Sequence, residues 1–488
     1  MAAGPSKVHS ALRVTALSSG VNFGLALVAA VVIARLLSPR EIGIHSVAVS
    51  LVAFTHILRE FGVGQYFLQL PVLDRDHLRA GFTAMLIMSW GIAAVLLLTA
   101  GAAAGFYGEP GVGDVFRTLA GSFMVLPFGS HILSHLKREL RFDLLAWVQM
   151  STALVSTAAS IYLAWQGHSY LSMAWGTVLG NIFTVLLLFT LRPMLALLTP
   201  TTRHLREIFR FGGLASSASL VNQFGGSAPD IVLGKTQSME AVAHYSRAAG
   251  LLGMVAAKAD EIVIQVFTPT FADRLRRGSS APETLSMAIT LHTGIIMPLL
   301  ATLAVLGEPL TLLMFGAQWA LAAQLAPWLL GYAVISAPVT LAQHALYAGG
   351  HAKTVLMGSA IFNTVLFAVF LSSIWLDLTE IVVLIGIVRI VMLVVWSRLL
   401  RSVYGFTSSH LASAVRPSLA LTLATGGAAI GASWTAGHFD STQSHLIAVL
   451  AIGVTAISAY LSALRASRHP MRAALADFAP PLRVVLRP

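Results

Sequence analysis

The chain has 488 residues, of which 56% are hydrophobic and only 10% are charged. A soluble protein carries about 25% charged residues, so this composition excludes a soluble protein and indicates a polytopic membrane protein. The formal net charge of +11 would suit nucleic-acid binding, but in a membrane protein it is typical of cytoplasmic loops rich in lysine and arginine. The chain has no cysteine, which excludes disulfides and thiolate metal sites within it.

Long apolar stretches predict an all-α membrane fold of about fourteen transmembrane helices, because a helix needs about 20 apolar residues to cross a bilayer. The connections between them are short, and no stretch suits a soluble domain. The expected helices are 14–36, 43–66, 80–104, 115–136, 143–165, 170–191, 208–234, 239–268, 284–306, 320–348, 352–375, 379–400, 413–436 and 445–464.

The distribution of basic residues predicts the orientation of these helices. With the N-terminus in the cytoplasm, most of the 31 lysines and arginines fall in cytoplasmic loops or at the helix ends beside them. The opposite side receives Arg35, Arg40, Arg117 and Lys235. This asymmetry follows the positive-inside rule and predicts that both termini are cytoplasmic. The polar start and the long apolar run after it are not typical of a cleavable signal peptide.

Two stretches about 200 residues apart indicate an internal repeat. Residues 34–46 read ARLLSPREIGIHS and residues 234–246 read GKTQSMEAVAHYS, so that Ser38 aligns with Ser238. The tripeptide Gly-Glu-Pro occurs at 108–110 and again at 307–309, each time expected after the third helix of its half. The sequence therefore predicts two six-helix lobes in the same orientation, related by a pseudo-two-fold axis along the membrane normal, with two extra C-terminal helices.

The expected domain organisation follows from this repeat. Residues 1–192 form an N-lobe of helices one to six, and 193–207 form an amphipathic cytoplasmic linker. Residues 208–402 form a C-lobe of helices seven to twelve, and 403–464 hold helices thirteen and fourteen. Residues 465–488 form a basic tail, which is expected to lie on anionic lipid.

One expected helix carries charges that are costly inside a membrane. The stretch 239–273 holds Arg247, Lys258, Asp260 and Glu261, and each charge at a bilayer centre costs about 2.5–3.5 kcal/mol on insertion scales. At about 100° per residue, Arg247, Lys258, Glu261 and Gln265 share one face, whereas Asp260 points elsewhere. Either this face lines a transport cavity, or Lys258 and Glu261 form a pair between helices while Arg247 reaches an interface.

Further charges lie in three other expected helices. Arg59 and Glu60 lie near the cytoplasmic end of helix two, where interfacial solvation is an equally good explanation. Arg389 lies in the middle of helix twelve, and an unpaired arginine there would need a cavity or an acid. Asp230 follows Pro229 near the outer end of helix seven, where it could serve a cation or cap the helix. The histidines at 45 and 56 have no third ligand at metal spacing, so no metal site is expected.

Several motifs resemble the polysaccharide-repeat-unit (Wzx-type) flippases of the multidrug/oligosaccharidyl-lipid/polysaccharide (MOP) exporter superfamily. In the first half they are ARLLSPREIGIHSVA (34–48), LREFGVGQYFLQ (58–69) and LKRELRFDLLAWVQ (136–149). In the second half they are DIVLGKTQSMEAVAHYSRA (230–248), VFTPTFADR (266–274) and GEPLTLLMFGAQW (307–319). Each motif alone is loose, but together and in order they are fairly specific and span the first twelve helices.

The resemblance implies alternating access between two lobes and transport of an undecaprenyl-diphosphate-linked oligosaccharide from the cytoplasmic to the periplasmic leaflet of a bacterial inner membrane. Such transport would serve exopolysaccharide, capsule or O-antigen synthesis, and it implies membrane lipids, a polymerase and other assembly proteins as partners, with no nucleic acid. Asp230 and Arg247 match positions where the family often has an acid and a base. Lys258, Asp260 and Glu261 stand where the family is commonly more apolar.

The charged residues suggest roles in such a transporter. Arginine binds phosphate well because its planar fork donates two parallel hydrogen bonds, so a cationic cavity is expected from Arg59, Arg247, Lys258 and Arg389. The acidic residues are candidates for coupling to H⁺ or Na⁺, with no other cofactor, and they are Asp230, Asp260, Glu261 and Glu60.

Two alternatives remain open at this point, and a third is excluded. A cation-coupled exporter of small amphipathic molecules would have the same fold but an anionic cavity, and a lipid II flippase fits the region of helices one and two less well. A membrane-embedded glycosyltransferase would need a large outer loop, which the short connections exclude. The sequence contains no G-x-x-x-x-G-K-[ST], G-x-S-x-G or H-E-x-x-H motif, so we expect a secondary transporter and not an enzyme.

Overall fold

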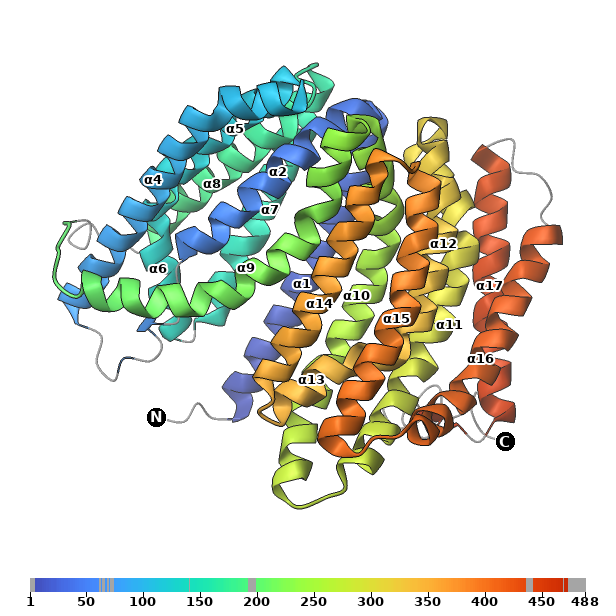
Figure 1. Cartoon of the computed structure of the whole chain (residues 1–488). Helices are drawn as coiled ribbons and strands as arrows, with labels where there is room; N and C mark the ends of the chain where they lie inside the picture. The colour runs from blue at the N-terminus through green and yellow to red at the C-terminus, as the bar shows by residue number, and fades with distance from the viewer. Residues whose placement is uncertain are drawn as a thin grey trace. The chain divides into compact units, whose positions relative to one another are not determined.

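The computed structural model describes residues 5–60, 63, 66–67, 70, 74–139, 141–191, 199–435, 442–467 and 469–472, and every regular element in these residues is helical. The chain divides into two compact units, which we call unit 1 (Met1–Ala243) and unit 2 (His244–Pro488). Figure 1 shows both units as bundles of long helices. The expected all-α membrane fold is therefore confirmed.

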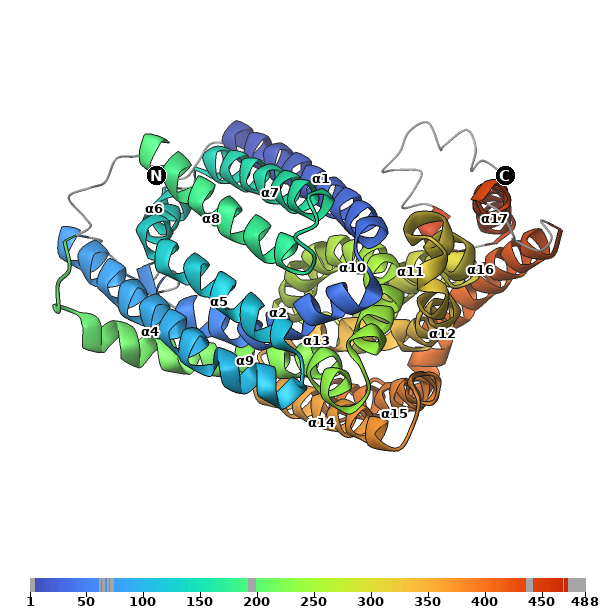
Figure 2. The same cartoon turned by 90° about the horizontal axis from the view of Figure 1, so that it is seen from above.

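Unit 1 is a layered bundle. Figure 2 shows α1, α7 and α8 on one side and α4 and α9 on the other, with α2 and α5 between them. Its helices are α1 (Pro5–Leu36), α2 (Pro39–Glu60), α4 (Arg75–Tyr107), α5 (Pro110–Val125), α6 (Pro127–Arg138), α7 (Phe142–Trp165), α8 (Leu171–Leu191) and α9 (Leu205–Thr236). In Figure 1, α9 first runs along one end of the bundle and then turns to pack along α2.

Unit 2 is built around α11, which packs against α12, α16 and α17. α15 joins α12 to α14 on the other side of the bundle. Its helices are α10 (Met239–Arg276, whose first turns belong to unit 1), α11 (Ala281–Phe315), α12 (Ala320–Ser336), α13 (Thr340–Ala348), α14 (Ala352–Leu371), α15 (Leu378–Tyr404), α16 (Ser408–Thr435) and α17 (Thr442–Ala466), with short 3₁₀ turns η2 (Ala317–Trp319), η3 (Ala337–Val339) and η4 (Ser372–Ile374).

Local sequence signals explain several helix ends. Asp74 caps α4 by accepting a hydrogen bond from the backbone N–H of His77 at 2.8 Å, and Gly108 ends the same helix with a φ of 67°. At α15, Asp377 and Glu380 form a capping box, and Gly405 ends the helix with a φ of 68°. A side-chain acceptor before a helix satisfies free N–H groups, and glycine adopts the left-handed conformation without a Cβ clash.

The described helices differ in whether they are long and apolar enough to cross a membrane. Within the described residues, 9 helices are long and apolar enough to cross a membrane, or up to 10 if the bent α5–α6 pair is one span. The expected count of fourteen spans is therefore not confirmed, although each expected range overlaps a helix among the described residues. α2, α9, α10 and α16 are not among these candidates, and the side chains of residues 211–222 of α9 lie outside the described part of the chain.

Exposed aromatic residues mark the helix ends that we expect at the outer face. Trp165 ends α7, Trp375 follows η4 and Trp434 lies in the last turn of α16, and each indole is largely exposed. Tryptophan is enriched at membrane–water interfaces because its ring is apolar and its N–H is polar. Long aliphatic side chains such as Leu98 and Leu423 are exposed between the ends, as expected of lipid-facing surfaces.

The structure agrees with one part of the internal repeat and corrects another. α1 ends at Leu36 and α2 begins at Pro39, whereas α9 ends at Thr236 and α10 begins at Met239, so the two turns occupy equivalent places. The two Gly-Glu-Pro tripeptides differ, however. Gly108 ends α4, but the second tripeptide lies inside α11, which continues to Phe315. Gly307 packs there closely against Pro327, and α11 tolerates Pro309 in its interior.

The compact units do not coincide with the expected lobes, whose boundaries stay a prediction. Residues 193–198 of the expected linker lie outside the described part, and α9 begins within the remainder of that linker. α9 packs on α2 and α4, so the first helix of the second repeat belongs to unit 1. The expected basic tail lies outside the described residues after 472.

Candidate functional site

Arg247 lies in the third turn of α10, and its guanidinium contacts aromatic rings. The guanidinium carbon is 5.5 Å from the ring centre of Phe315 and 5.6 Å from that of Trp319, and the ring of His244 contacts Trp319 edge to face. The Nε atom is buried and has no hydrogen-bond partner among the described residues. A cation above an aromatic face is attracted by the ring quadrupole. The two rings therefore position the guanidinium without using its N–H donors.

Lys258, Glu261 and Gln265 form a polar ladder along α10, about three turns further on. Lys258 Nζ lies 2.6 Å from Glu261 Oε2, and Gln265 donates a hydrogen bond to the other carboxylate oxygen at 3.3 Å. The lysine and glutamate side chains are about half exposed, so this is not a pair buried between helices. Arg247 takes no part in this ladder. A ligand can bind Lys258 only if it competes with Glu261 for the lysine.

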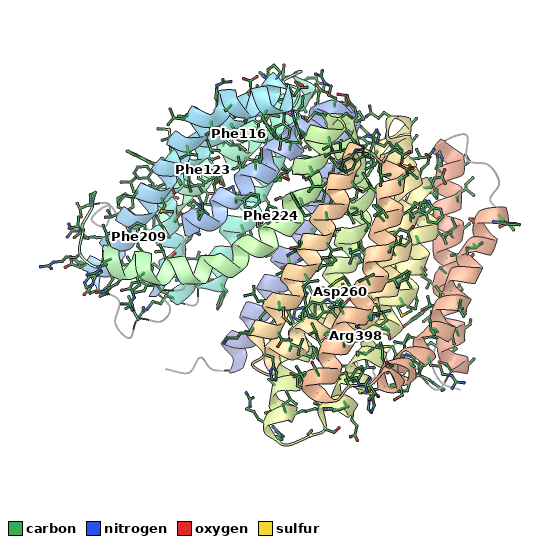
Figure 3. All side chains as sticks on the ribbon, in the orientation of Figure 1. Phe116, Phe123, Phe209, Phe224, Asp260 and Arg398 are labelled. Atoms are coloured by element: carbon green, nitrogen blue, oxygen red, sulfur yellow. The ribbon has the colours of Figure 1, made fainter. Side chains whose placement is uncertain are left out.

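Asp260 lies on a different face of α10 and contacts a buried histidine. Its Oδ1 lies 2.6 Å from Nε2 of His292 on α11. Figure 3 shows Asp260 within the helices of unit 2. The histidine was not singled out from the sequence, although LHTG (291–294) interrupts an otherwise apolar helix. A polar residue within such a helix is the signal that could have identified it.

Arg389 on α15 also contacts an aromatic ring. Its guanidinium carbon lies 5.9 Å from the ring centre of Phe362 on α14, and Tyr245 on α10 is close enough for an electrostatic interaction. Tyr245 itself contacts Phe370 edge to face. The AVAHYSRA motif therefore provides His244, Tyr245 and Arg247 to one region of unit 2, and the GEPLTLLMFGAQW motif provides the rings under Arg247.

Asp230 lies in unit 1, on the side of α9 that packs on α2. Its Oδ2 accepts a hydrogen bond of 2.5 Å from the Ser50 hydroxyl. One turn earlier, Ser227 donates to the Ser50 backbone carbonyl at 3.1 Å and accepts from Gln223 at 2.8 Å. This seam is interhelical, so Asp230 is not a loop residue. Ser50 was not predicted, because a lone serine in an apolar helix carries no functional signal.

Arg59 and Glu60 end α2. The Arg59 side chain is partly exposed, whereas the Glu60 side chain lies outside the described part of the structure. His56 packs its ring on Phe123 of α5 at 4.9 Å. Within the residues searched, no three His, Cys, Asp or Glu side chains are placed to hold a metal ion.

The ARLLSPREIG stretch (34–43) has a structural role in unit 1. Arg40 forms an ion pair of 2.6 Å with Glu109 of the first Gly-Glu-Pro tripeptide, and Glu41 accepts hydrogen bonds from Ser38 and Ser169. These contacts join the α1–α2 turn to the α4–α5 and α7–α8 turns. The polar residues of this motif therefore stabilise three neighbouring turns and are not free for a ligand.

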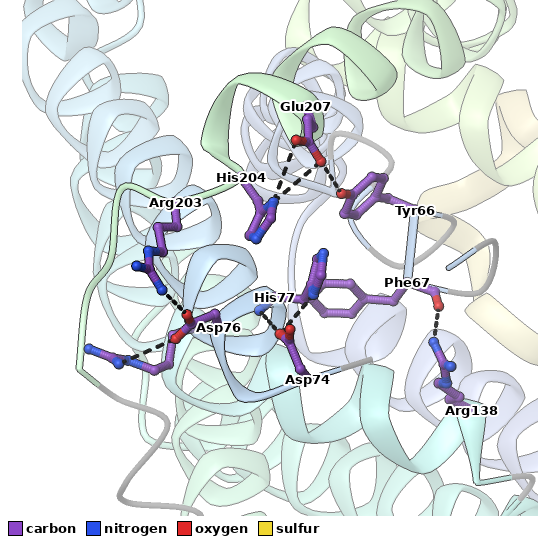
Figure 4. A network of polar contacts seen from close by, with 10 residues as sticks. Tyr66, Phe67, Asp74, Asp76, His77, Arg138, Arg203, His204 and Glu207 are labelled. Carbon is purple, nitrogen blue, oxygen red and sulfur yellow. Dashed lines mark hydrogen bonds and ion pairs between the residues drawn. The ribbon is translucent and has the colours of Figure 1, made fainter. Parts of the chain in front are cut away.

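A second polar network joins the α2–α4 segment to the start of α9, and Figure 4 shows it. Tyr66 donates a hydrogen bond of 3.0 Å to Glu207, and His204 stacks on His77 with ring centres 4.1 Å apart. His77 contacts the cap residue Asp74 at 2.7 Å. The bonds from Tyr66 and then His204 hold the pKa of Glu207 below its usual range. Burial, and then the bond to Glu207, raises the pKa of Tyr66 to about 12.

The fold is similar to those of two solved membrane transporters. The structure is similar to a lipid II flippase, MurJ, in an inward closed conformation, with a TM-score of 0.70 and 13% sequence identity over 91% of this chain and 97% of that chain. It is also similar to an inward-facing MATE-family multidrug transporter of the MOP superfamily, with a TM-score of 0.58 and 16% identity over 79% of this chain and 95% of that chain. At these identities the likeness shows the fold alone.

Sequence comparison gives the family. Residues 32–324 match the model of the polysaccharide biosynthesis protein family, and the chain belongs to this family. It is 22% identical to the lipopolysaccharide biosynthesis protein WzxC of Escherichia coli (64% of each chain) and 22% identical to the succinoglycan biosynthesis transport protein ExoT of Rhizobium meliloti (63% of this chain, 62% of the relative). It is 21% identical to the teichuronic acid biosynthesis protein TuaB of Bacillus subtilis (81% and 83%).

The matches to WzxC and ExoT cover less than two thirds of each relative. The family match ends at residue 324, within α12, so it contains the α10 charges and the rings under Arg247 but not Arg389. The expected resemblance is confirmed at the level of the family and of the superfamily fold.

Proposed function

We propose that this protein is a flippase that moves an oligosaccharide linked to undecaprenyl diphosphate from the cytoplasmic to the periplasmic leaflet of a bacterial inner membrane. Membership of the polysaccharide biosynthesis family supports this proposal, as do the biosynthetic names of WzxC, ExoT and TuaB. The protein is then a secondary transporter and not an enzyme, and it supplies a polymerase and other polysaccharide-assembly proteins.

The observation that carries the proposal is the setting of Arg247. Its buried Nε has no hydrogen-bond partner among the described residues, and two aromatic rings position the guanidinium. A diphosphate offers several anionic oxygens, and charge-assisted hydrogen bonds to a guanidinium are about twice as strong as neutral ones. Arg247 therefore has a prepositioned fork that suits a diphosphate.

The other candidate charges receive secondary roles in this proposal. Arg389 and Arg59 add positive charge along the path of the head group, and Lys258 exchanges Glu261 for a phosphate oxygen. Asp230, Asp260, Glu261 and Glu60 are the acids through which H⁺ or Na⁺ couples to transport. A cation-coupled exporter and a lipid II flippase remain the alternative outcomes of the test.

The experiment measures leaflet exchange in proteoliposomes. A fluorescent undecaprenyl-diphosphate oligosaccharide is incorporated, and a membrane-impermeant quencher reports the fraction that has changed leaflet. We expect flipping by the wild type and a loss of about tenfold or more in R247Q, because one bond to a charged group contributes about 1.5–3 kcal/mol. R247K should recover only part of the rate, because lysine keeps the charge but lacks the planar fork.

The matched control is Arg277→Gln, which removes an exposed arginine that pairs with Asp273 at 2.9 Å just beyond the end of α10. This variant should flip at the wild-type rate. Equal rates in R247Q and the wild type would remove Arg247 from the site. Absence of flipping by the wild type, together with export of small organic cations, would establish the exporter alternative. A strong preference for lipid II over other diphosphate-linked sugars would establish the alternative of a lipid II flippase.

A further inference from the structure

Unit 2 contains a buried pair of titratable side chains for which the proposed substrate path has no use. His292 on α11 is 0% exposed, and its Nε2 lies 2.6 Å from Oδ1 of Asp260, which is 26% exposed. The Nδ1 atom of His292 is also buried and has no hydrogen-bond partner among the described residues. One ring nitrogen therefore bonds a carboxylate, and the other is an unoccupied acceptor.

A second histidine interacts with this pair. His344 on α13 interacts electrostatically with both Asp260 and His292. It lies five residues before Gly349, which is about 7 Å along a helix. Since the Gly349–Gly350 turn lies on the expected cytoplasmic side, the three side chains lie close to that surface but within the bundle.

Apolar residues lie one or two turns along the helix from each of the three side chains. Phe267 of α10, Ile289 of α11 and Leu341 of α13 belong to one buried hydrophobic cluster that also includes residues of α15 and α16. In such a cluster a net charge is poorly solvated, and an uncompensated buried charge is strongly destabilising. Protonation therefore decides whether the Asp260–His292 pair carries a net charge inside this cluster.

The neighbouring charged and titratable groups have other contacts. On α10, Lys258 pairs with Glu261. On α15, Arg389 lies over Phe362 and the Tyr404 hydroxyl donates to the Ala345 carbonyl at 2.7 Å. On the segment after α17, His469 lies against Gly294 of α11 and its Nε2 is 3.1 Å from the Ser418 hydroxyl. Asp260, His292 and His344 interact with one another.

We propose that Asp260, His292 and His344 form a proton-binding site that links the conformation of unit 2 to cytoplasmic pH. With a neutral imidazole and a carboxylate, the Asp260–His292 pair has a net charge of about −1. A proton taken from the cytoplasm onto Nδ1 of His292 makes the ring an imidazolium, and the pair becomes neutral overall. Since burial disfavours net charge, the neutral pair is less costly to bury than the pair with a net charge.

Conformational coupling follows from the free Nδ1. When it carries a proton in the present arrangement, it becomes a buried N–H donor without an acceptor, which costs about 1–3 kcal/mol. A conformation that provides an acceptor or water at Nδ1 binds the proton more tightly. A ligand shifts an equilibrium by its differential affinity for the two states, so protonation favours that second conformation. Linkage to transport rests on the proposed function, but proton binding does not.

The test is a titration of the full chain in lipid nanodiscs, labelled with ¹⁵N-histidine. The His292 resonances are identified by their loss in H292Q and followed by NMR from pH 5 to pH 9. We expect His292 to titrate within this range. The midpoint should move by at least one pH unit in D260N, which removes the partner charge, and should move measurably in H344Q. The conservative D260E variant should keep the titration.

His410→Gln is the matched control, because it removes a histidine that bonds Thr407 at the start of α16. It should leave the His292 midpoint unchanged. A His292 ring that keeps one protonation state from pH 5 to pH 9, or a midpoint that is the same in D260N, D260E and H344Q, would overturn the proposal and leave a structural pair. If D260N does not fold, the comparison of D260E with H344Q still decides.

Flipping assays then separate this proposal from the proposed function. In proteoliposomes, the wild-type flipping rate should change at least threefold with pH on the cytoplasmic face, and H292Q should lose this dependence. Flipping that is independent of pH would overturn the link to conformation and leave the flippase function intact. Absence of flipping at every pH would overturn the function, while the NMR titration would still decide whether the proton site exists.

Discussion

At the residue scale, the candidate cations differ in how they are satisfied. Arg247 and Arg389 contact aromatic rings, whereas Lys258 pairs with an acid three residues away. The Lys258–Glu261 contact could be predicted, because residues three apart on a helix are neighbours. The rings under Arg247 could not, because Phe315 and Trp319 are distant in sequence and their motif carries no signal for a cation. Similar charges in one helix thus have different availability to a ligand.

The Tyr66–Glu207 bond predicts a pH-dependent contribution to stability. Because the pKa of Glu207 is lowered in the folded chain, its contribution is full above the ordinary range of a glutamate and is lost as the pH falls through the folded pKa. Y66F should therefore melt below the wild type at pH 7, and the difference should shrink as the pH falls below about 4. Melting midpoints from pH 3.5 to pH 8 in detergent measure this effect.

The Tyr66–Glu207 bond also predicts a loss of stability at alkaline pH. The raised pKa of Tyr66, about 12, means that the neutral phenol stabilises the fold up to the ordinary tyrosine range and that this contribution disappears as the pH approaches the folded value. S130A, which removes an intrahelical hydroxyl in α6, is the control and should melt in parallel with the wild type. A constant difference between Y66F and the wild type at every pH would contradict the assignment.

The close packing at Gly43 leaves no room for a side chain. A Cβ at this position would overlap the backbone carbonyl of Met239, where the α1–α2 turn meets the α9–α10 turn. We expect G43A to lose about 1–3 kcal/mol or more of stability, the usual cost of overpacking. G91A is the control, because a Cβ at Gly91 meets nothing within 4 Å, and alanine favours helix by about 1 kcal/mol. Equal melting midpoints would show that the turns do not need this contact.

At the element scale, the last two helices are more than an appendage. α16 packs along α11 and buries Ser418, whose hydroxyl lies 2.8 Å from that of Thr293 and 3.1 Å from Nε2 of His469. Thr290 also donates to the Ala414 carbonyl at 2.9 Å. These bonds join α11, α16 and the segment after α17. Hydropathy predicts the helices but not this seam, because the hydroxyls of threonine and serine are common in membrane helices without tertiary partners.

This seam predicts a loss of stability in S418A. The substitution leaves Nε2 of His469 and the Thr293 hydroxyl without this partner, which costs about 1–3 kcal/mol for buried groups. The matched control on the same helix is S413A, because Ser413 is exposed and bonds only the His410 carbonyl of its own helix. Thermal unfolding in detergent should separate the two variants, and identical midpoints would mean that the seam contributes nothing measurable.

At the scale of the whole molecule, composition and charge predicted the membrane class, the all-α fold and the approximate position of every helix. Pro127 and Pro338 could be named as possible kink sites, and α5–α6 and α12–α13 break there. The sequence did not show which prolines would break a helix, because proline is tolerated inside some helices and breaks others. Pro309 lies within a continuous α11, whereas Pro127 begins α6. The difference depends on the packing around each proline, which is a tertiary property.

The orientation remains a prediction that the absence of cysteine makes simple to test. Single cysteines are introduced at His168, between α7 and α8, and at Ser279, between α10 and α11. We expect a membrane-impermeant maleimide to label H168C in intact spheroplasts and S279C only after permeabilisation, because basic residues cluster on the cytoplasmic side. Labelling of S279C in intact spheroplasts would contradict cytoplasmic termini.

The place of α9 has a consequence for the history of the chain. α9 begins the second repeat, but it packs on α2 and α4 of the first. If the two repeats arose from duplication of a six-helix ancestor, the packing of α9 on α2 and α4 would descend from an interface between two copies, and fusion would have made that interface permanent. Fragments 1–200 and 201–488, expressed separately, should then each be degraded, and their coexpression should restore both.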